Sequence, residues 1–103
     1  MPSALTKLSR NMAWKIEFSK KADQTLNKLD QETRKRIIRF VQERIAPSGN
    51  PRSFGAALEG DRFKRFWKYR VGDYRLVCDI QDQIVTILIV KIGNRKDVYK
   101  DNS

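Results

Sequence analysis

The stretch RFKRFWKYRVGDYRLVCDI, residues 62 to 80, decides the fold. It contains two runs of alternating side chains separated by Gly72 and Asp73. A glycine followed by aspartate between such runs is typical of a tight β-hairpin turn, because glycine readily takes the positive φ that these turns require. The stretch therefore predicts two antiparallel strands joined by a short turn.

The first strand of this hairpin has two unlike faces. Successive side chains of a strand point to opposite sides, so Tyr69 faces one way while Lys68 and Arg70 face the other. Residues 62 to 75 include six Lys or Arg and a single acid, Asp73. A surface so dense in cations repels itself unless an anion lies on it. A phosphate backbone is the natural candidate.

The composition excludes several classes of enzyme and metal site. The chain has 103 residues, a formal charge of +10 and a pI near 10.1, which fits one small domain that binds nucleic acid or another acidic partner. It contains no histidine, which excludes a two-histidine ribonuclease, a Ser-His-Asp triad and most zinc sites. The single cysteine, Cys78, is expected to fill core space. We expect no metal and no cofactor.

The residues before the hairpin predict one strand and two helices. Residues 13 to 18 alternate as a half-buried strand, and Ser19 then caps a helix that ends near Leu29. Asp30 caps a second helix, expected over residues 31 to 45. Because the connection is so short, we expect the two helices to form an antiparallel helical hairpin.

The remaining segments complete the expected architecture. Residues 46 to 57 predict a loop, Asp82-Gln83 a turn, and residues 84 to 92 a central strand that is apolar on both faces. We expect residues 1 to 11 to be a flexible tail and residues 12 to 103 a single domain. The predicted fold is α+β: an antiparallel meander plus the N-terminal strand form a four-stranded sheet that packs against the helical hairpin.

Four local patterns carry a family resemblance. They are IEFS at 16 to 19, LEG at 58 to 60, YRVGDYRLV at 69 to 77 and KIGNRKDVY at 91 to 99. In this order, they resemble the RelE/ParE superfamily of toxins from bacterial and archaeal toxin–antitoxin pairs. The resemblance covers about residues 13 to 99 and implies the RelE-like fold.

The resemblance also implies an activity. The RelE branch consists of metal-independent endonucleases that cleave messenger RNA in the ribosomal A site. By position, Lys68, Arg75, Arg95 and Tyr99 match the family's catalytic residues. Arg75 and Lys68 suit the charge of the phosphate, while Lys68 or Tyr99 is expected to take the proton of the 2′-hydroxyl and Arg95 to assist the leaving group.

Two departures from the family pattern bear on this chemistry. Phe66 stands where some members have a second lysine, for which Lys64 or Arg65 is the possible substitute. Asn94 stands where many members have histidine. Both changes remove a possible general acid or base.

Further cations are expected to bind RNA or the ribosome: Lys64, Arg65, Arg70, Lys96, Arg34, Lys35 and Arg39. For the three on the second helix, a solvated surface is the equally weighted alternative.

The sequence has no transmembrane run, and its first twelve residues lack the apolar stretch of a signal peptide, so we expect a cytoplasmic protein with no membrane association. The resemblance implies that it binds a RelB-like antitoxin, the ribosome and messenger RNA. Two alternatives stay open: a ParE-type inhibitor of DNA gyrase, and a basic nucleic-acid-binding domain without catalysis.

Overall fold

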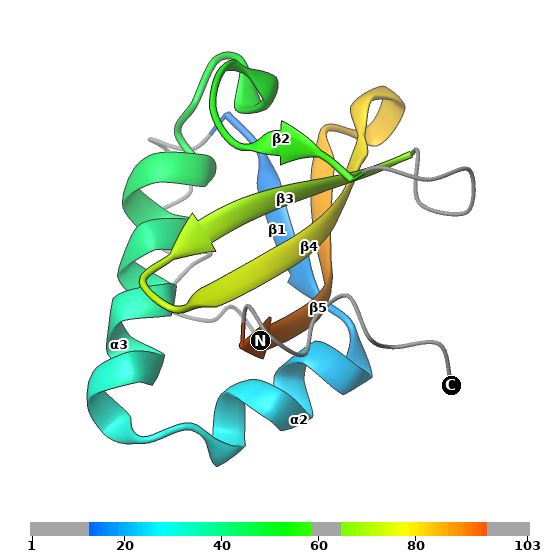
Figure 1. The fold of residues 1–103 in the computed structure, drawn as a ribbon. Coiled ribbons are helices and arrows are strands. Elements are labelled where there is room, and N and C mark those ends of the chain that lie inside the picture. Colours follow the sequence, from blue (N-terminus) through cyan, green and yellow to red (C-terminus); the bar gives the residue numbers. More distant parts are fainter. Residues whose placement is uncertain (1–12, 59–64, 95–103) are drawn as a thin grey trace.

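The fold is a mixed sheet with two helices against one of its faces, seen in a computed structural model that describes residues 13–58 and 65–94 (Figure 1). The strands run in the spatial order β1-β5-β4-β3-β2. β1 is parallel to β5, and the other pairs are antiparallel. In chain order the elements are β1 (Lys15–Phe18), α2 (Lys20–Lys28), α3 (Gln31–Phe40), η2 (Val41–Ile45), η3 (Pro51–Ser53), β2 (Ala56–Ala57), β3 (Phe66–Val71), β4 (Tyr74–Gln81), η5 (Asp82–Ile84) and β5 (Thr86–Asn94).

The predicted hairpin and α+β class are confirmed, but the sheet has five strands rather than four. β3 and β4 meet at the expected turn, where Gly72 has a φ of +61°. The additional strand is β2, whose two alanines pair with Trp67 and Lys68 of β3. A two-residue strand shows no alternation in the sequence, so it was expected to be part of a loop. The predicted N-terminal tail lies outside the described residues.

Both helix starts follow from their caps. The Ser19 hydroxyl accepts a hydrogen bond from the Ala22 amide at 3.0 Å, and the Asp30 carboxylate accepts one from the Thr33 amide at 3.2 Å. The second cap lowers the pKa of Asp30, chiefly through its hydrogen bonds with Thr33.

The expected antiparallel packing of the two helices is wrong. Figure 1 shows α2 and α3 meeting at a wide angle rather than lying side by side. Leu29 and Asp30 both have extended backbones, which turn the chain sharply between the helices. α2 then packs on β5 and β1, while α3 packs on β3. Each apolar stripe therefore finds a different part of the sheet instead of the other helix.

The core lies between the helices and one sheet face. Its completely buried side chains include Ile37 and Ile45 from the helical segment and Leu76, Ile87 and Ile89 from the sheet. A second, smaller cluster lies on the opposite face, where Leu58 and Val77 are buried with Phe66 and Val90 packed against them.

The turn before β5 differs from the prediction. Ile84 and Val85 were expected in the strand, but they lie in the turn with 65% and 46% of their surface exposed. Val85 has a φ of +49°, a left-handed conformation that is unfavourable for a β-branched residue. The central position of β5 between β1 and β4 is as predicted.

Candidate nucleic-acid interface

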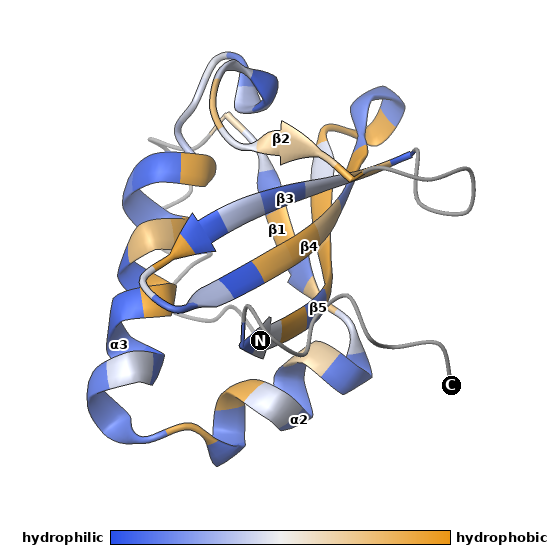
Figure 2. Ribbon diagram, viewed as in Figure 1, coloured by the Kyte–Doolittle hydropathy of each residue, from blue (hydrophilic) through white to orange (hydrophobic). Residues whose placement is uncertain are grey.

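Four cations share the sheet face opposite the helices. We call this set, Lys68, Arg70, Arg75 and Lys91, the open basic face. Residues that pair across a ladder point to the same side, and Arg70 pairs with Arg75 while Val77 pairs with both Lys68 and Lys91. Figure 2 shows hydrophilic segments along β3 and at the hairpin end of β4, beside the more hydrophobic middle of β4. Three neighbouring strands thus contribute positive charge to one surface.

Arg75 is the most constrained of these cations. Its side chain is half-buried, and its Nη1 atom donates to the carbonyl oxygens of Gly72 at 3.4 Å and Tyr74 at 3.2 Å. The hairpin turn therefore holds one edge of the guanidinium. Because a guanidinium has five N–H donors in a rigid fork, other donors stay available for an anion.

The carboxylates on this face already have cationic partners. Asp79 lies 3.4 Å from Arg65, and Glu17 of β1 lies 3.2 Å from Lys15. Arg70 is exposed and makes no ion pair within the part of the chain that the structure describes. Arg70 and Arg75 also face each other directly, which is unfavourable for two like charges. This arrangement favours an anionic partner.

The two departures from the family pattern lie in different surroundings. Phe66 packs in the small apolar cluster with Val77 on the open side of the sheet. Asn94 ends β5 opposite Tyr74, a residue packed against the helix-covered core. Only the first departure therefore lies on the same face as Lys68 and Arg75.

Two of the predicted binding cations have intramolecular partners. Arg65 pairs with Asp79, and its guanidinium lies 5.2 Å from the centroid of the Phe66 ring. Arg34 donates to the carbonyl oxygen of Leu29 at 3.2 Å, at the end of α2. These contacts stabilise the start of β3 and the corner between the helices.

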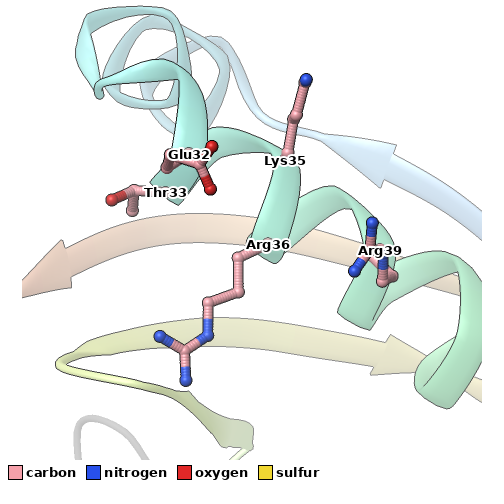
Figure 3. A pocket seen from close by; sticks show the side chains of 5 residues that line it. All are labelled: Glu32, Thr33, Lys35, Arg36 and Arg39. Atoms are coloured by element: carbon pink, nitrogen blue, oxygen red, sulfur yellow. The ribbon is translucent and has the colours of Figure 1, made fainter.

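A second basic surface lies on α3, and we call Lys35, Arg36 and Arg39 the α3 basic edge. With Glu32 and Thr33 these residues line a surface depression of about 470 Å³ (Figure 3). Arg36 extends toward the β3–β4 turn, where its Nη1 would lie 3.0 Å from a Cβ atom on Gly72. The α3 basic edge therefore adjoins the hairpin end of the open basic face.

The α3 basic edge has no carboxylate partner among residues 13–58 and 65–94, although Glu32 shares the depression.

Some predicted site residues cannot be placed. Lys64, Arg95, Lys96 and Tyr99 lie outside the described residues. Of the proposed catalytic set, the structure therefore brings Lys68 and Arg75 together on one face. Sequence reasoning did not single out Lys91 or Arg36. Arg36 was visible as one more cation on the helix, whereas the position of Lys91 depends on an irregularity in β5.

Two aromatic residues of the hairpin pack inside the fold and form hydrogen bonds to the segment before β2. Tyr69 is 1% exposed and its hydroxyl donates to the carbonyl oxygen of Pro51, while Trp67 Nε1 donates to Phe54 O at 2.8 Å. Burial raises the pKa of the Tyr69 phenol and of the completely buried Cys78 thiol. Both groups are therefore neutral packing residues near pH 7, as predicted for Cys78.

The described residues contain no cluster of three or more His, Cys, Asp or Glu side chains suited to a metal ion. No helix among them has the length and hydrophobicity needed to span a bilayer.

Solved structures with the same fold include several RelE toxins. The RelBE2 toxin–antitoxin complex of Mycobacterium tuberculosis has a TM-score of 0.72 and 23% identity, over 84% of this chain and 95% of that one. The isolated Escherichia coli RelE toxin gives 0.65 and 22%, over 86% and 94%. The archaeal RelE–RelB complex of Pyrococcus horikoshii gives 0.61 and 22%, over 84% and 100%. At these identities the likeness establishes the fold.

Sequence comparison establishes the family. No curated protein matched the sequence significantly. Residues 16–99, however, match the family described as the ParE toxin of the type II toxin–antitoxin system parDE. This match extends over most of the chain. It includes β2 to β5 and all of β1 except Lys15. The expected membership of the RelE/ParE superfamily is confirmed, and the chain belongs to the ParE toxin family of type II toxin–antitoxin systems.

Proposed function

We propose that this toxin inhibits translation by cleaving messenger RNA on the ribosome, through metal-independent attack of the RNA's own 2′-hydroxyl. One observation carries the proposal: Lys68 and the half-buried Arg75 lie on the same open face of the sheet, two pairs apart along the β3–β4 ladder. The RelE-like fold supports the same reaction class.

The chemistry needs four operations. The 2′-hydroxyl must lose a proton, it must lie in line with the phosphorus, the phosphate must be stabilised as negative charge develops, and the leaving oxygen must gain a proton. Arg75 serves the third operation, because the turn carbonyls orient its planar fork before RNA arrives. Lys68 adds a point charge beside it and is one candidate for the base. Tyr99 as the other candidate, and Arg95 at the leaving group, remain predictions.

RNA and ribosome contacts are proposed for the surrounding cations. Lys35 and Arg39 are exposed on α3, and Arg70 is exposed beside the turn. Arg34 and Arg65 also remain predictions, although smaller effects are expected from them because each already has an intramolecular partner. Lys64 and Lys96 complete the proposed set.

We also propose that an antitoxin holds this toxin inactive. The Mycobacterium tuberculosis and Pyrococcus horikoshii relatives are complexes with antitoxins. An acidic chain complements a protein of charge +10, and a helix of such a chain lying over the open basic face would exclude RNA from it. The proposed assembly is a hetero-oligomer of toxin and antitoxin.

A second candidate is inhibition of DNA gyrase. It is favoured by the family match, whose description names ParE toxins. In that case the open basic face would dock a protein rather than cleave RNA.

The deciding experiment is in vitro translation with the purified protein, followed by primer extension along the message. We expect new 5′ ends inside codons at stalled ribosomes. Arg75→Ala should lower cleavage by about 10²–10³-fold, since loss of one preorganised donor typically has an effect of this size. Arg52→Ala is the matched control, because Arg52 pairs with Asp82 away from the open basic face. An intact message with unaffected translation would overturn the proposal and make a gyrase supercoiling assay the next measurement.

A further inference from the structure

Lys91 lies on the open basic face because β5 contains a bulge. Ile87 and Ile89 are completely buried on the helix-covered side, so strict alternation would also turn Lys91 toward that side. Instead, the ladder changes register between Val77 and Cys78. Val77 pairs with Lys91 and Cys78 with Ile89, which leaves Val90 as the additional residue. Lys91 thereby joins the open face, and Ile92 returns to the core at 3% exposure.

The bulge has a specific anchor in the rest of the fold. The carbonyl oxygen of Val90 accepts a hydrogen bond from the Ser19 hydroxyl at 2.8 Å. The same hydroxyl accepts the Ala22 amide as the cap of α2. The start of α2 therefore fixes the backbone immediately before Lys91. Bulges commonly re-aim a side chain next to a functional site, and this one places a third strand's cation beside Lys68 and Arg75.

The register gives the spacing of these cations. Lys68 and Lys91 lie directly opposite Val77 on its two sides. Since neighbouring strands are about 4.8 Å apart, their Cα atoms are roughly 10 Å apart, and two flexible lysine stems can converge over the small buried side chain between them. On this face, the next pair toward the hairpin turn is Arg75 and Gly93. Because Gly93 has no side chain, none stands between the side chains of Arg75 and Lys91.

We propose that Lys91 binds the same RNA phosphate as Lys68. Phe66 and Val77 form the apolar floor beside the phosphate. This inference deepens the proposed function, because it takes RNA as the ligand of the open basic face.

The test uses a short single-stranded RNA whose 2′-O-methyl groups prevent cleavage. Fluorescence anisotropy at several salt concentrations gives the affinity and its salt dependence. We expect Lys91→Ala to weaken binding about fivefold to tenfold at low salt. The slope of log K against log[salt] should fall by less than about 0.7, the value for one whole phosphate contact on a single strand, because Lys68 still contacts that phosphate. Lys91→Arg should retain most of the affinity. Lys20→Ala, an exposed lysine at the start of α2, is the matched control and should leave the slope unchanged.

A double-mutant cycle tests the shared phosphate. If Lys68 and Lys91 contact one phosphate, the combined loss in Lys68→Ala/Lys91→Ala should be smaller than the sum of the single losses. Additive losses, or an unchanged affinity and slope in Lys91→Ala, would overturn the inference, as would absence of RNA binding by the unmodified protein. Lys91→Gln and a thermal melt distinguish lost binding from lost folding.

The nuclease proposal and the Lys91 proposal can fail separately, and each failure gives a different experimental result. If the unmodified protein leaves messages intact while Lys91→Ala still weakens RNA binding, the nuclease proposal is wrong and the phosphate contact stands. If messages are cleaved and Lys91→Ala binds and cleaves normally, the nuclease proposal stands and the proposed phosphate contact of Lys91 is wrong.

Discussion

The two faces of β4 and β5 differ in their surroundings. On the covered side, Leu76 and Ile87 are entirely enclosed by the protein's own helices. On the other side of the same strands, Arg75 and Lys91 lie among further cations. The first face is enclosed within the chain, whereas the second carries four cations, of which Arg70 and Arg75 face each other directly. The alternation of side chains along β4, together with the bulge in β5, separates the two faces.

Leu76→Ala should produce the largest effect, because it opens a cavity on the covered face. We expect the free energy of unfolding to fall by about 2–5 kcal/mol, the usual cost of this truncation in a core. Urea unfolding measures it. The neighbouring Arg75→Ala, on the open face, should change the free energy of unfolding far less. Equal losses in the two variants would contradict the separation of the faces.

Tyr69→Phe sharpens the comparison by removing a single polar group from the covered face. Loss of the hydrogen bond to Pro51 should reduce stability by about 1–3 kcal/mol at pH 7, since a buried carbonyl loses its donor.

The same variant should change the response to alkali. Burial raises the folded-state pKa of Tyr69 above its ordinary value of 10.0, so its contribution is present below that value and is lost as the pH rises through the folded-state pKa. Tyr69→Phe should therefore flatten the fall in stability above about pH 10, leaving a part from Cys78, whose pKa burial also raises. An unchanged slope in thermal unfolding between pH 9 and 11 would contradict this expectation.

Arg70→Ala should give the smallest effect, and its sign is the opposite. Removal of one of two directly opposed arginines is expected to raise stability by about 0.2–1 kcal/mol at low salt. The gain should shrink in 1 M salt, where charges are screened within about 3 Å. Urea unfolding at both salt concentrations checks this, and a loss of stability would show that Arg70 contributes to packing instead.

Local signals in the sequence were sufficient for most of the fold. Ser19 and Asp30 marked both helix starts, and Gly72-Asp73 marked the hairpin, because capping and turn chemistry depend on residues that are adjacent in the chain. β2 was missed because two alanines become a strand only by pairing with β3. The angle between the helices was missed because it depends on which strands each helix covers.

The residues of the candidate site also divide into those predicted by local signals and those whose position depends on long-range pairing. Lys68 and Arg75 were found from alternation and family pattern, and the ladder places them on one face. Lys91 was not found, because regular alternation from Ile87 turns it toward the core. The bulge at Val90 reverses this, and it depends on pairing with β4 and on a hydroxyl from the start of α2.

The parallel pairing of β1 with β5 has a consequence for biosynthesis. The Ser19 hydroxyl donates to a carbonyl oxygen 71 residues later in the chain, and among the described strands β1 pairs only with β5. A ribosome makes β1 early and β5 late, so the sheet cannot be completed until nearly all of the domain has left the exit tunnel. Contacts this distant in sequence also form slowly. Synthesis order therefore delays the appearance of the folded domain until late in translation.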